Sequence, residues 1–375
     1  MTGLVLVAGD FTPFGGMDRA NLELARHAAG RHPVHLVTHR AAAVLADHPN
    51  VTVHRVGRPL GRHLLGQPLL AAVGRQVASR LSRQGYRVLV NGGNCRWGDV
   101  NWVHYVHAAF PARPTGSLVR RTKARAADWW ARRTERDSLR LAQVVICNSR
   151  RTARDVVEFV GVRAERTRVV YLGTDPAEFA LVTPADRAAA RRELGWDDRP
   201  WAVFVGALGD ARKGFDVLYA AWTALCRDPT WDANLAVVGR GADLPRWRDR
   251  AAADGLAERV RFLGFRTDVP RVLAAADGMA HPARYDAYGL AAHEALCRGI
   301  PVIVSAAAGV SERYPASLAD LILTDPESAG ELADRLRSWR THLDSLRAAI
   351  RPLADTLRGR TWTDMAADIL ALVEG

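Results

Sequence analysis

Short apolar runs alternate with stretches of helical periodicity along most of the chain. Seven runs rich in Val, Ile and Leu occupy the first half, at residues 4–8, 34–38, 51–56, 88–91, 102–106, 144–148 and 169–172. Six more follow, at residues 202–206, 235–238, 260–263, 278–281, 301–305 and 321–323. Strands this short and apolar, separated by helices, are typical of parallel sheets covered on both faces. The two series therefore predict two doubly wound, Rossmann-like α/β domains.

The region between the two series, residues 173–200, contains three prolines, a charged helical stretch and no strand pattern. We therefore expect a first domain, a second domain and a C-terminal helix, at residues 1–175, 176–358 and 359–375. The terminal helix has a candidate N-cap at Thr361 or Thr363 and is long enough to pack on either domain. In such proteins ligands bind at the carboxyl ends of the strands, so we expect a cleft between the domains to hold the site.

The composition, 48% hydrophobic and 25% charged residues, is that of a globular protein. The four cysteines are widely scattered, which argues against a zinc site or a disulfide framework and favours a reducing compartment. The first apolar run is too short and lacks the basic lead of a signal peptide, and no run approaches the roughly twenty apolar residues of a membrane span. We expect a cytoplasmic protein.

The net charge of +12 is compatible with nucleic acid, an anionic membrane surface or anionic small molecules as partners. Of the 52 basic residues, only Lys123 and Lys213 are lysine. Where arginine is used almost everywhere else, a lysine indicates a place that requires a compact ammonium group.

The most informative stretch lies at residues 281–312, HPARYDAYGLAAHEALCRGIPVIVSAAAGVSE. Asp286 and Glu294 stand eight residues apart on either side of Gly289. The pattern predicts a loop that carries Asp286, then a helix that begins near Gly289 and carries Glu294 in its second turn. A helix start attracts anions and carboxylates accept hydrogen bonds from sugar hydroxyls, so a nucleotide sugar fits. The alternative is an amphipathic helix with solvated acids.

Two glycine loops follow apolar runs. Gly15 and Gly16 precede a helix that begins near Asp18, where the backbone can approach a phosphate, although a tight turn without ligand is equally compatible. Gly239 and Gly241 resemble the start of a dinucleotide fingerprint, but Leu244 replaces the third glycine. Nicotinamide binding is therefore not expected, and Gly239 instead predicts a close turn or a contact with a nucleotide base.

The loop after residues 202–206 carries Arg212, Lys213 and Gly214 before the next helix. An arginine and a lysine beside a glycine at the end of a strand can clamp a diphosphate and balance its charge as it leaves. The alternative is an ordinary basic loop in an arginine-rich protein, and the rarity of lysine favours the functional interpretation.

His104 and His107 lie at the end of a predicted strand of the first domain, in NWVHYVHAAF. The position suits a site residue, although a lone histidine is more often structural. No Asp-x-Asp motif occurs and no histidine has ligand spacing with acids, so no catalytic metal is expected.

The segment 113–140 contains nine basic and three acidic residues, with Trp129 and Trp130 near its middle. A basic helix with indole rings suits an anionic membrane surface. The alternative is a long helix packed by its tryptophans, with solvated arginines.

Taken together, these segments resemble retaining glycosyltransferases of family 4, which have the two-domain GT-B fold. The resemblance covers nearly the whole chain and rests on the order and spacing of several motifs. These are FGGMDRANLELARHAA, CNSRRTARDVV, VVYLGTDPAEF, FVGALGDARKGFDVL, NLAVVGRGADL, VRFLGFRTDV, the 281–312 stretch and TWTDMAADIL.

The resemblance implies roles for second-domain residues. Arg212 and Lys213 would hold the donor diphosphate, Glu294 would bind the ribose hydroxyls, and Asp286 would contact the donor sugar. Backbone contacts would come from Ala287, Tyr288, Gly289 and Leu290. In the first domain, the resemblance places Gly15 and Gly16 near the distal phosphate and His107, with His104 as the weaker match, near the reacting sugar.

The resemblance further implies transfer of a sugar, without metal or other cofactor, from a nucleoside diphosphate sugar to a hydroxyl acceptor such as a glycan, a lipid-linked molecule or a small molecule. Two positions depart from the family. Asp286 replaces the usual glutamate, and Ala207 stands where many members have an arginine, for which Arg212 could substitute. The alternative is a noncatalytic GT-B scaffold that binds nucleic acid or an anionic membrane surface. In the main hypothesis, nucleic acid is not a partner.

Overall fold

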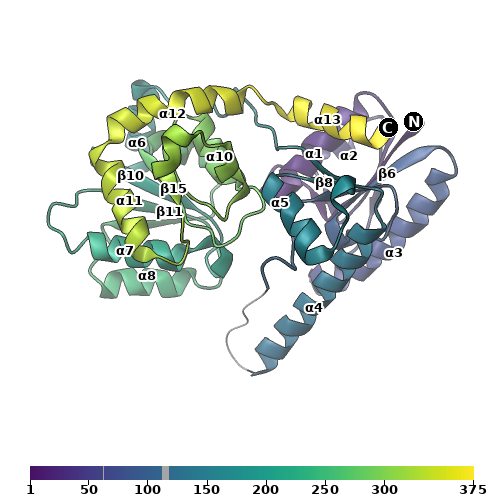
Figure 1. Ribbon diagram of the computed structural model, residues 1–375, viewed down its shortest axis with the longest axis horizontal. Helices are drawn as coiled ribbons and strands as arrows, with labels where there is room; N and C mark the ends of the chain where they lie inside the picture. Colours follow the sequence, from purple (N-terminus) through teal and green to yellow (C-terminus); the bar gives the residue numbers. More distant parts are fainter. Residues whose placement is uncertain (62, 112–117) are drawn as a thin grey trace. The chain divides into compact units, whose positions relative to one another are not determined.

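The computed structural model describes residues 1–61, 63–111 and 118–375, which fold into two compact units (Figure 1). Unit 1 comprises Met1–Gly173 together with Thr361–Gly375, and unit 2 comprises Thr174–Arg360. The chain thus leaves unit 1 once and returns to it for its last helix. Within the described residues, no helix is both long and apolar enough to cross a bilayer.

Unit 1 is built on a seven-stranded parallel sheet in the order β5-β3-β1-β6-β7-β8-β9. Its strands are β1 (Gly3–Val7), β3 (Val34–Thr38), β5 (Val51–Arg55), β6 (Tyr86–Asn91), β7 (Val100–Val103), β8 (Val144–Cys147) and β9 (Thr167–Val169). A separate two-residue pairing joins β2 (Asp10–Phe11) to β4 (Arg40–Ala41), directly after β1 and β3.

Helices surround this sheet. They are α1 (Gly16–Ala29), α2 (Ala43–Ala46), α3 (His63–Ser82), α4 (Leu118–Leu141), α5 (Arg150–Asp155) and α13 (Trp362–Glu374), with short helical turns η1 (Pro59–Gly61), η2 (Gly92–Asn94), η3 (Val156–Val160) and η4 (Ala164–Arg166). The C-terminal helix α13 packs beside α1, and Thr361 is its N-cap, in a capping box with Asp364.

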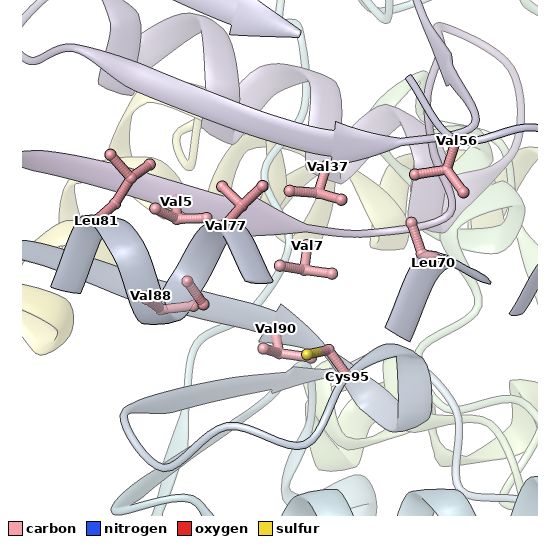
Figure 2. Close-up of a cluster of buried hydrophobic side chains, with 11 residues drawn as sticks. Val5, Val7, Val37, Val56, Leu70, Val77, Leu81, Val88, Val90 and Cys95 are labelled. Atoms are coloured by element: carbon pink, nitrogen blue, oxygen red, sulfur yellow. The ribbon is translucent and has the colours of Figure 1, made fainter. Parts of the chain in front are cut away.

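The core of unit 1 explains why its strands are apolar on both faces. In β1, Val5 and Val7 point toward α3, where they meet Leu70, Val77 and Leu81 (Figure 2). Leu4 and Leu6, which alternate with Val5 and Val7 along β1, are equally buried. A strand buried on both faces cannot show polar alternation, so it reads as a continuous apolar run.

Unit 2 repeats the architecture with a six-stranded parallel sheet in the order β12-β11-β10-β13-β14-β15. Its strands are β10 (Trp201–Val205), β11 (Asn234–Val238), β12 (Val260–Gly264), β13 (Gly278–His281), β14 (Val302–Ser305) and β15 (Ile322–Leu323). Its helices are α6 (Pro184–Leu194), α7 (Phe215–Leu225), α8 (Leu244–Ala253), α9 (Val269–Ala275), α10 (Leu290–Cys297), α11 (Ala329–Thr341) and α12 (Leu343–Arg358), with turns η5 (Ala211–Lys213), η6 (Gly309–Arg313) and η7 (Ala316–Leu321).

The strand order places a switch point between β10 and β13. From β10 the chain proceeds outward through β11 and β12, then returns to β13 and proceeds through β14 and β15 in the other direction. The connections from β10 and β13 therefore lead to opposite sides of the sheet, and open α/β sheets bind ligands at the carboxyl ends of such adjacent strands.

These two sheets confirm the predicted fold class of two doubly wound parallel α/β domains, and each of the thirteen predicted runs contributes a strand. Two predictions were wrong in position. The run at 102–106 pairs only as Val100–Val103, because the chain turns away from the sheet before His104, and the run at 169–172 pairs as Thr167–Val169. The pairings β2 and β4 were not predicted, since two residues show no periodicity.

A buried carboxylate anchors the start of β13. Asp277 is 3% exposed and accepts hydrogen bonds from Arg191, from Arg347 and, at 2.8 Å, from the backbone N–H of Trp201. The arginines come from α6 and α12, so one side chain joins both helices to the sheet. Removing one partner of a buried ion pair strands the other charge without compensation.

We expect Asp277→Asn to lower the free energy of unfolding of unit 2 by about 3–5 kcal/mol, as measured by urea denaturation. Asp344→Asn is the matched control, since Asp344 pairs with the same Arg347 at 3.0 Å but is 95% exposed. An exposed pair contributes about 0–1 kcal/mol. Equal effects of the two substitutions would contradict the assignment of Asp277 as the anchor.

Candidate active site

The loops after β10 and β13 approach each other closely. Gly214 has a φ of +68°, and a Cβ added to it would lie 2.0 Å from the carbonyl oxygen of Pro282. Only glycine fits, both for the left-handed backbone and for the contact. This approach brings Lys213, the residue before Gly214, next to the 281–289 loop.

Lys213 and Asp286 form an ion pair. The Lys213 Nζ donates a hydrogen bond to the Asp286 Oδ2 over 2.7 Å, although the residues are 73 positions apart. The His281 Nε2 lies 3.2 Å from the same oxygen and its side chain is 3% exposed. The Lys213 and Asp286 side chains are 21% and 16% exposed, so a ligand can reach both.

The environment keeps Asp286 ionised. Burial by itself would raise the pKa of this carboxyl, but the charge of Lys213 and the contact with His281 together hold its pKa well below its usual range. The backbone is fixed as well, because the Asp286 N–H donates to Ala307 O over 3.1 Å and the Gly309 N–H donates to Asp286 O over 3.0 Å. The acid is thus a fixed negative charge between the β13 and β14 loops.

Helix α10 begins directly after this loop, with Gly289 as its N-cap at a φ of +96°. The sequence prediction of a helix start at Gly289 is confirmed. Leu290 and Ala291 in the first turn and Glu294 in the second are partly exposed, whereas most of the remaining helix is buried. The first-turn amides of a helix have no intrahelical acceptor, so this end can bind an anion near the exposed face that carries Glu294.

Arg284 was not identified from the sequence, yet it holds the two loops together. Its side chain is 10% exposed and donates to Ala211 O and to both oxygens of Asp216 over 2.7 Å each, and it also contacts Glu327 at 2.8 Å. These carboxylates raise the pKa of Arg284 further above its ordinary value. Its position inside the 281–289 loop was the available signal.

The Arg212 side chain has different hydrogen-bond partners from that of Lys213. Its guanidinium donates to both carboxylate oxygens of Asp210, from Nε to Oδ1 over 3.1 Å and from Nη2 to Oδ2 over 2.5 Å. Its carbonyl accepts a hydrogen bond from the Arg284 N–H over 2.7 Å. Arg212 is therefore held in place by its own loop.

Close backbone contacts account for the glycines after β11. A Cβ on Gly239 would lie 1.8 Å from Gly206 O, and one on Gly241 would lie 1.5 Å from Leu208 O. The close turn that the sequence predicted is therefore present, between the β10 and β11 loops.

The residues between Asp286 and α10 turn their side chains inward. Tyr288 is 2% exposed, and its hydroxyl forms a 2.8 Å hydrogen bond with the Nδ1 of buried His293. Its carbonyl accepts from the Val310 N–H over 2.6 Å. Ala287 is also buried. These residues therefore offer a ligand mainly their backbone.

In unit 1, Gly15 directly precedes α1 and Gly16 is the first residue of that helix. Gly15 is the N-cap of α1 at a φ of +87°, and a Cβ there would lie 3.8 Å from the Asp18 Oδ2. The Asp18 carboxyl therefore folds back over the glycine loop. Burial, with a smaller contribution from the charge of Asp10, raises the pKa of Asp18 to about 7. Below about pH 7 the Asp18 carboxyl is therefore mostly neutral and does not oppose an anion at this helix start.

Asp10 is the charged neighbour of Asp18. It is 5% exposed and accepts from the Arg40 Nη2 over 2.6 Å and from the Arg58 Nη2 over 2.9 Å. Asp10 and Arg40 lie in β2 and β4, which follow β1 and β3, and Arg58 follows β5, so the cluster lies after the carboxyl ends of three neighbouring strands.

The two candidate histidines have different environments. The His104 ring packs on Trp102 at 4.1 Å between centroids, and burial lowers its pKa to about 3, which supports the structural interpretation. His107 is 43% exposed, and its Nδ1 lies 2.9 Å from the Oε1 of Glu135. The sequence reasoning missed Glu135, because its only signal was one acid within a basic helix.

The basic segment 113–140 forms α4 from Leu118 onward, and its first residues, 113–117, lie outside the described residues. Trp129 is 61% exposed and Trp130 is 41% exposed. The Arg133 guanidinium lies 5.8 Å from the Trp129 ring centroid. Both indoles are thus exposed, whereas the alternative considered from the sequence has them packed.

Comparisons with known proteins identify the family. The model for Glycosyltransferase Family 4 matches residues 14–178, and the model for Glycosyl transferases group 1 matches residues 199–341. The D-inositol 3-phosphate glycosyltransferase of Salinispora arenicola is 33% identical over 336 residues, which cover 79% of this chain and 73% of that protein. The chain belongs to glycosyltransferase family 4. The enzyme of the same name from Nocardia farcinica is 30% identical over 319 residues, covering 81% of this chain and 69% of that protein.

Solved structures show the same fold for this family 4 glycosyltransferase. WaaG, a glycosyltransferase involved in lipopolysaccharide biosynthesis, superposes with a TM-score of 0.78 at 22% identity, covering 99% of this chain and 100% of that one. Anabaena Alr3699/HepE in complex with UDP and glucose has a TM-score of 0.74 at 20% identity, with full coverage of both chains. The GT-B fold is therefore shown for this chain.

The raised pKa of Asp18 makes the stability of unit 1 depend on pH. An unfolded aspartate ionises near pH 4, so the stabilisation from protonated Asp18 is present below that pH and is lost as the pH rises through about 7. We expect Asp18→Asn to raise the melting temperature by several degrees at pH 8 and to change it little at pH 4. Asp47→Asn, at an exposed acid of the same unit, is the control. If the difference in melting temperature between Asp18→Asn and wild type is the same at every pH, this expectation is wrong.

Proposed function

We propose that this glycosyltransferase moves a sugar from a nucleoside diphosphate sugar to a hydroxyl acceptor, with retention of the anomeric configuration and without a metal ion. The observation that carries the proposal is the Lys213–Asp286 pair at the β10/β13 switch point, beside the start of α10. The pair offers a positive charge to a diphosphate and a carboxylate to sugar hydroxyls at one place. The relatives support a nucleotide sugar, since HepE was solved with UDP and with UDP-glucose.

In this proposal Lys213 binds the donor diphosphate, with Arg212 beside it, and Glu294 accepts hydrogen bonds from the ribose. The N–H groups at the start of α10, in the stretch 287–290, contribute backbone contacts. Gly239, in the loop after β11, contacts the nucleotide base. Gly15 and Gly16, with His107, are the contribution of unit 1 to the distal phosphate and the reacting sugar.

Asp286, which is one methylene shorter than the usual glutamate, can still contact the donor sugar. Lys213 and His281 both contact the same oxygen of Asp286, Oδ2. We assign Oδ1 to a hydroxyl of the donor sugar. A carboxylate that already holds the lysine keeps the ammonium in position before the donor arrives, so less ordering is needed on binding.

The reaction that fits these residues takes place on one face of the sugar. The bond from C1 to the diphosphate oxygen breaks while a bond forms from C1 to the acceptor oxygen, and the acceptor proton passes to the departing diphosphate. Lys213 compensates the charge that develops on the leaving group. The protein then contributes positioning and charge stabilisation, and no protein base is required.

A donor panel tests the proposal directly. Purified protein is mixed with uridine and guanosine diphosphate sugars, and a ligand at a hundred times its dissociation constant should stabilise the fold by about 2.7 kcal/mol. Donor hydrolysis or transfer should continue in excess EDTA, and proton NMR coupling constants should show that the product keeps the anomeric configuration of the donor. Inversion would refute the retaining mechanism, and loss of turnover in EDTA would refute metal independence.

Lys213→Ala should lower turnover by about 100- to 1000-fold, because it removes one charge from the departing diphosphate. Arg271→Ala is the matched control, since Arg271 is also a basic residue of unit 2 but forms an ion pair with Glu193 on its surface. Turnover is measured under saturating donor. Full activity of Lys213→Ala would show that the diphosphate binds elsewhere.

We further propose that α4 makes peripheral contact with an anionic membrane surface, so that the enzyme works in the cytoplasm at the inner face of the membrane on a lipid-linked acceptor. The exposed indoles of Trp129 and Trp130 on a basic helix support this. Tryptophan favours the membrane interface, and basic side chains are attracted to anionic lipids.

Cosedimentation with vesicles tests this contact. We expect wild-type protein to bind vesicles with anionic lipid and not neutral ones, and Trp129→Ala with Trp130→Ala to reduce binding severalfold. Val44→Ala is the control, because Val44 on α2 is an apolar side chain with a similar exposure of 52%. Equal recovery on neutral and anionic vesicles would exclude an electrostatic contact.

A further inference from the structure

Glu135 is a buried acid on a helix whose other acids pair with arginines. It is 1% exposed, whereas Asp137 is 33% exposed and lies 3.6 Å from Arg96, and Asp128 pairs with Arg132 one turn along the helix. Burying an ionised carboxylate costs several kcal/mol unless donors surround it. The donors that surround Glu135 all come from the loop after β7.

Three hydrogen bonds join Glu135 to this loop. Its Oε1 accepts from the backbone N–H of His107 over 3.0 Å and contacts the His107 Nδ1 at 2.9 Å. Its Oε2 accepts from the backbone N–H of Ala108 over 3.3 Å. The carboxylate therefore holds both the backbone and the ring of His107.

The sheet in turn holds Glu135 in place. A Cβ on Gly93, in the turn after β6, would lie 3.0 Å from the backbone nitrogen of Glu135, so the helix packs directly on that turn. One turn of helix later, the Ser138 hydroxyl donates to Cys95 O over 2.5 Å and accepts from the Asn101 Nδ2 over 3.0 Å. The Glu135 carboxylate is thus fixed relative to β6 and β7, and His107 is fixed through it.

The contact also selects the tautomer of His107. In the neutral ring, an Nδ1–H that donates to Glu135 leaves the lone pair on Nε2. The Tyr105 ring meets the imidazole edge-on at 4.6 Å between centroids and limits its rotation. The His107 side chain is nevertheless 43% exposed while that of Glu135 is 2% exposed, so the ring is held from its buried side and open on the other.

We propose that Glu135 is a positioning residue for catalysis, which holds His107 in one orientation and one tautomer for contact with the donor sugar. The inference rests on the proposed function, since it uses the role assigned there to His107. Backbone hydrogen bonds alone would secure the loop. The additional bond to the ring is what an oriented catalytic imidazole requires.

Steady-state kinetics of Glu135→Gln test the inference. Glutamine keeps the shape but has one acceptor oxygen and no charge, so we expect kcat to fall about 10- to 100-fold. The KM for the donor should change much less, because Lys213 and Glu294 in unit 2 are intact. Asp137→Asn on the same helix is the control and should keep wild-type kcat. Glu135→Asp, which keeps the charge, should restore part of the loss.

A second arm separates positioning from simple stability. In a His107→Ala background, Glu135→Gln should lower kcat by less than about twofold, because a residue that acts through another has little left to lose. Nitrogen-15 NMR of the His107 ring should show a proton on Nδ1 in wild type and a mixture of tautomers in Glu135→Gln. If Glu135→Gln does not fold, Glu135→Asp replaces it in the kinetic measurement, and its shorter side chain should lower kcat in the presence of His107 but by less than about twofold in the His107→Ala background.

The outcomes are distinguishable. If wild-type protein transfers no sugar from any donor, the proposed function fails. If wild type is active but Glu135→Gln matches Asp137→Asn, the inference alone fails. A kcat loss of equal size in the His107→Ala background, or an unchanged tautomer, would show that Glu135 only stabilises the loop.

Discussion

The candidate site of unit 2 depends on one close approach, the contact between Gly214 and the carbonyl of Pro282. Because no side chain fits between the two loops, the ends of β10 and β13 lie close enough for Lys213 to reach Asp286. Arg284, in the loop after β13, also joins the two loops through its hydrogen bonds to Ala211 and Asp216. The ion pair, the start of α10 and the backbone of the β14 loop all follow from this geometry. A larger residue at position 214 would separate the two charges that define the site.

Four buried or partly buried acids illustrate four ways in which the described structure stabilises a carboxyl group. Asp277 is surrounded by arginines and anchors helices to a sheet. Asp286 is paired with a lysine in a place that remains accessible. Glu135 is compensated mainly by backbone N–H groups and a histidine. Burial raises the pKa of Asp18 to about 7, so this acid binds a proton more readily than an exposed aspartate. A carboxylate that is removed from water must pair with a cation or a hydrogen-bond donor, or bind a proton. Which of these occurs determines whether the acid anchors other elements, contacts a ligand or is neutral.

The scarcity of lysine acquires a structural explanation at position 213. Arg212, its neighbour, uses its planar guanidinium to bind both oxygens of Asp210 and is held by its own loop. Lys213 instead places a compact ammonium against a single oxygen of Asp286 at the accessible edge. An ammonium has no fixed plane and can rotate to share its three protons between Asp286 and a ligand. The functional interpretation of Lys213 stays a prediction, and Lys123, the other lysine, lies exposed on α4.

The sequence by itself indicated the strands of the two large sheets, the start of α10 and the family, because apolar runs, glycines and capping residues act over a few neighbouring positions. It predicted a strand in all thirteen places and a helix start at Gly289. Only the tertiary structure decided which loops meet, since strand order brings Lys213 to a residue 73 positions away and packing brings Glu135 to His107 across 28. It also decided the protonation of Asp18, because burial depends on the whole fold. Long-range contacts leave no local periodicity, so no pattern along the chain could reveal them.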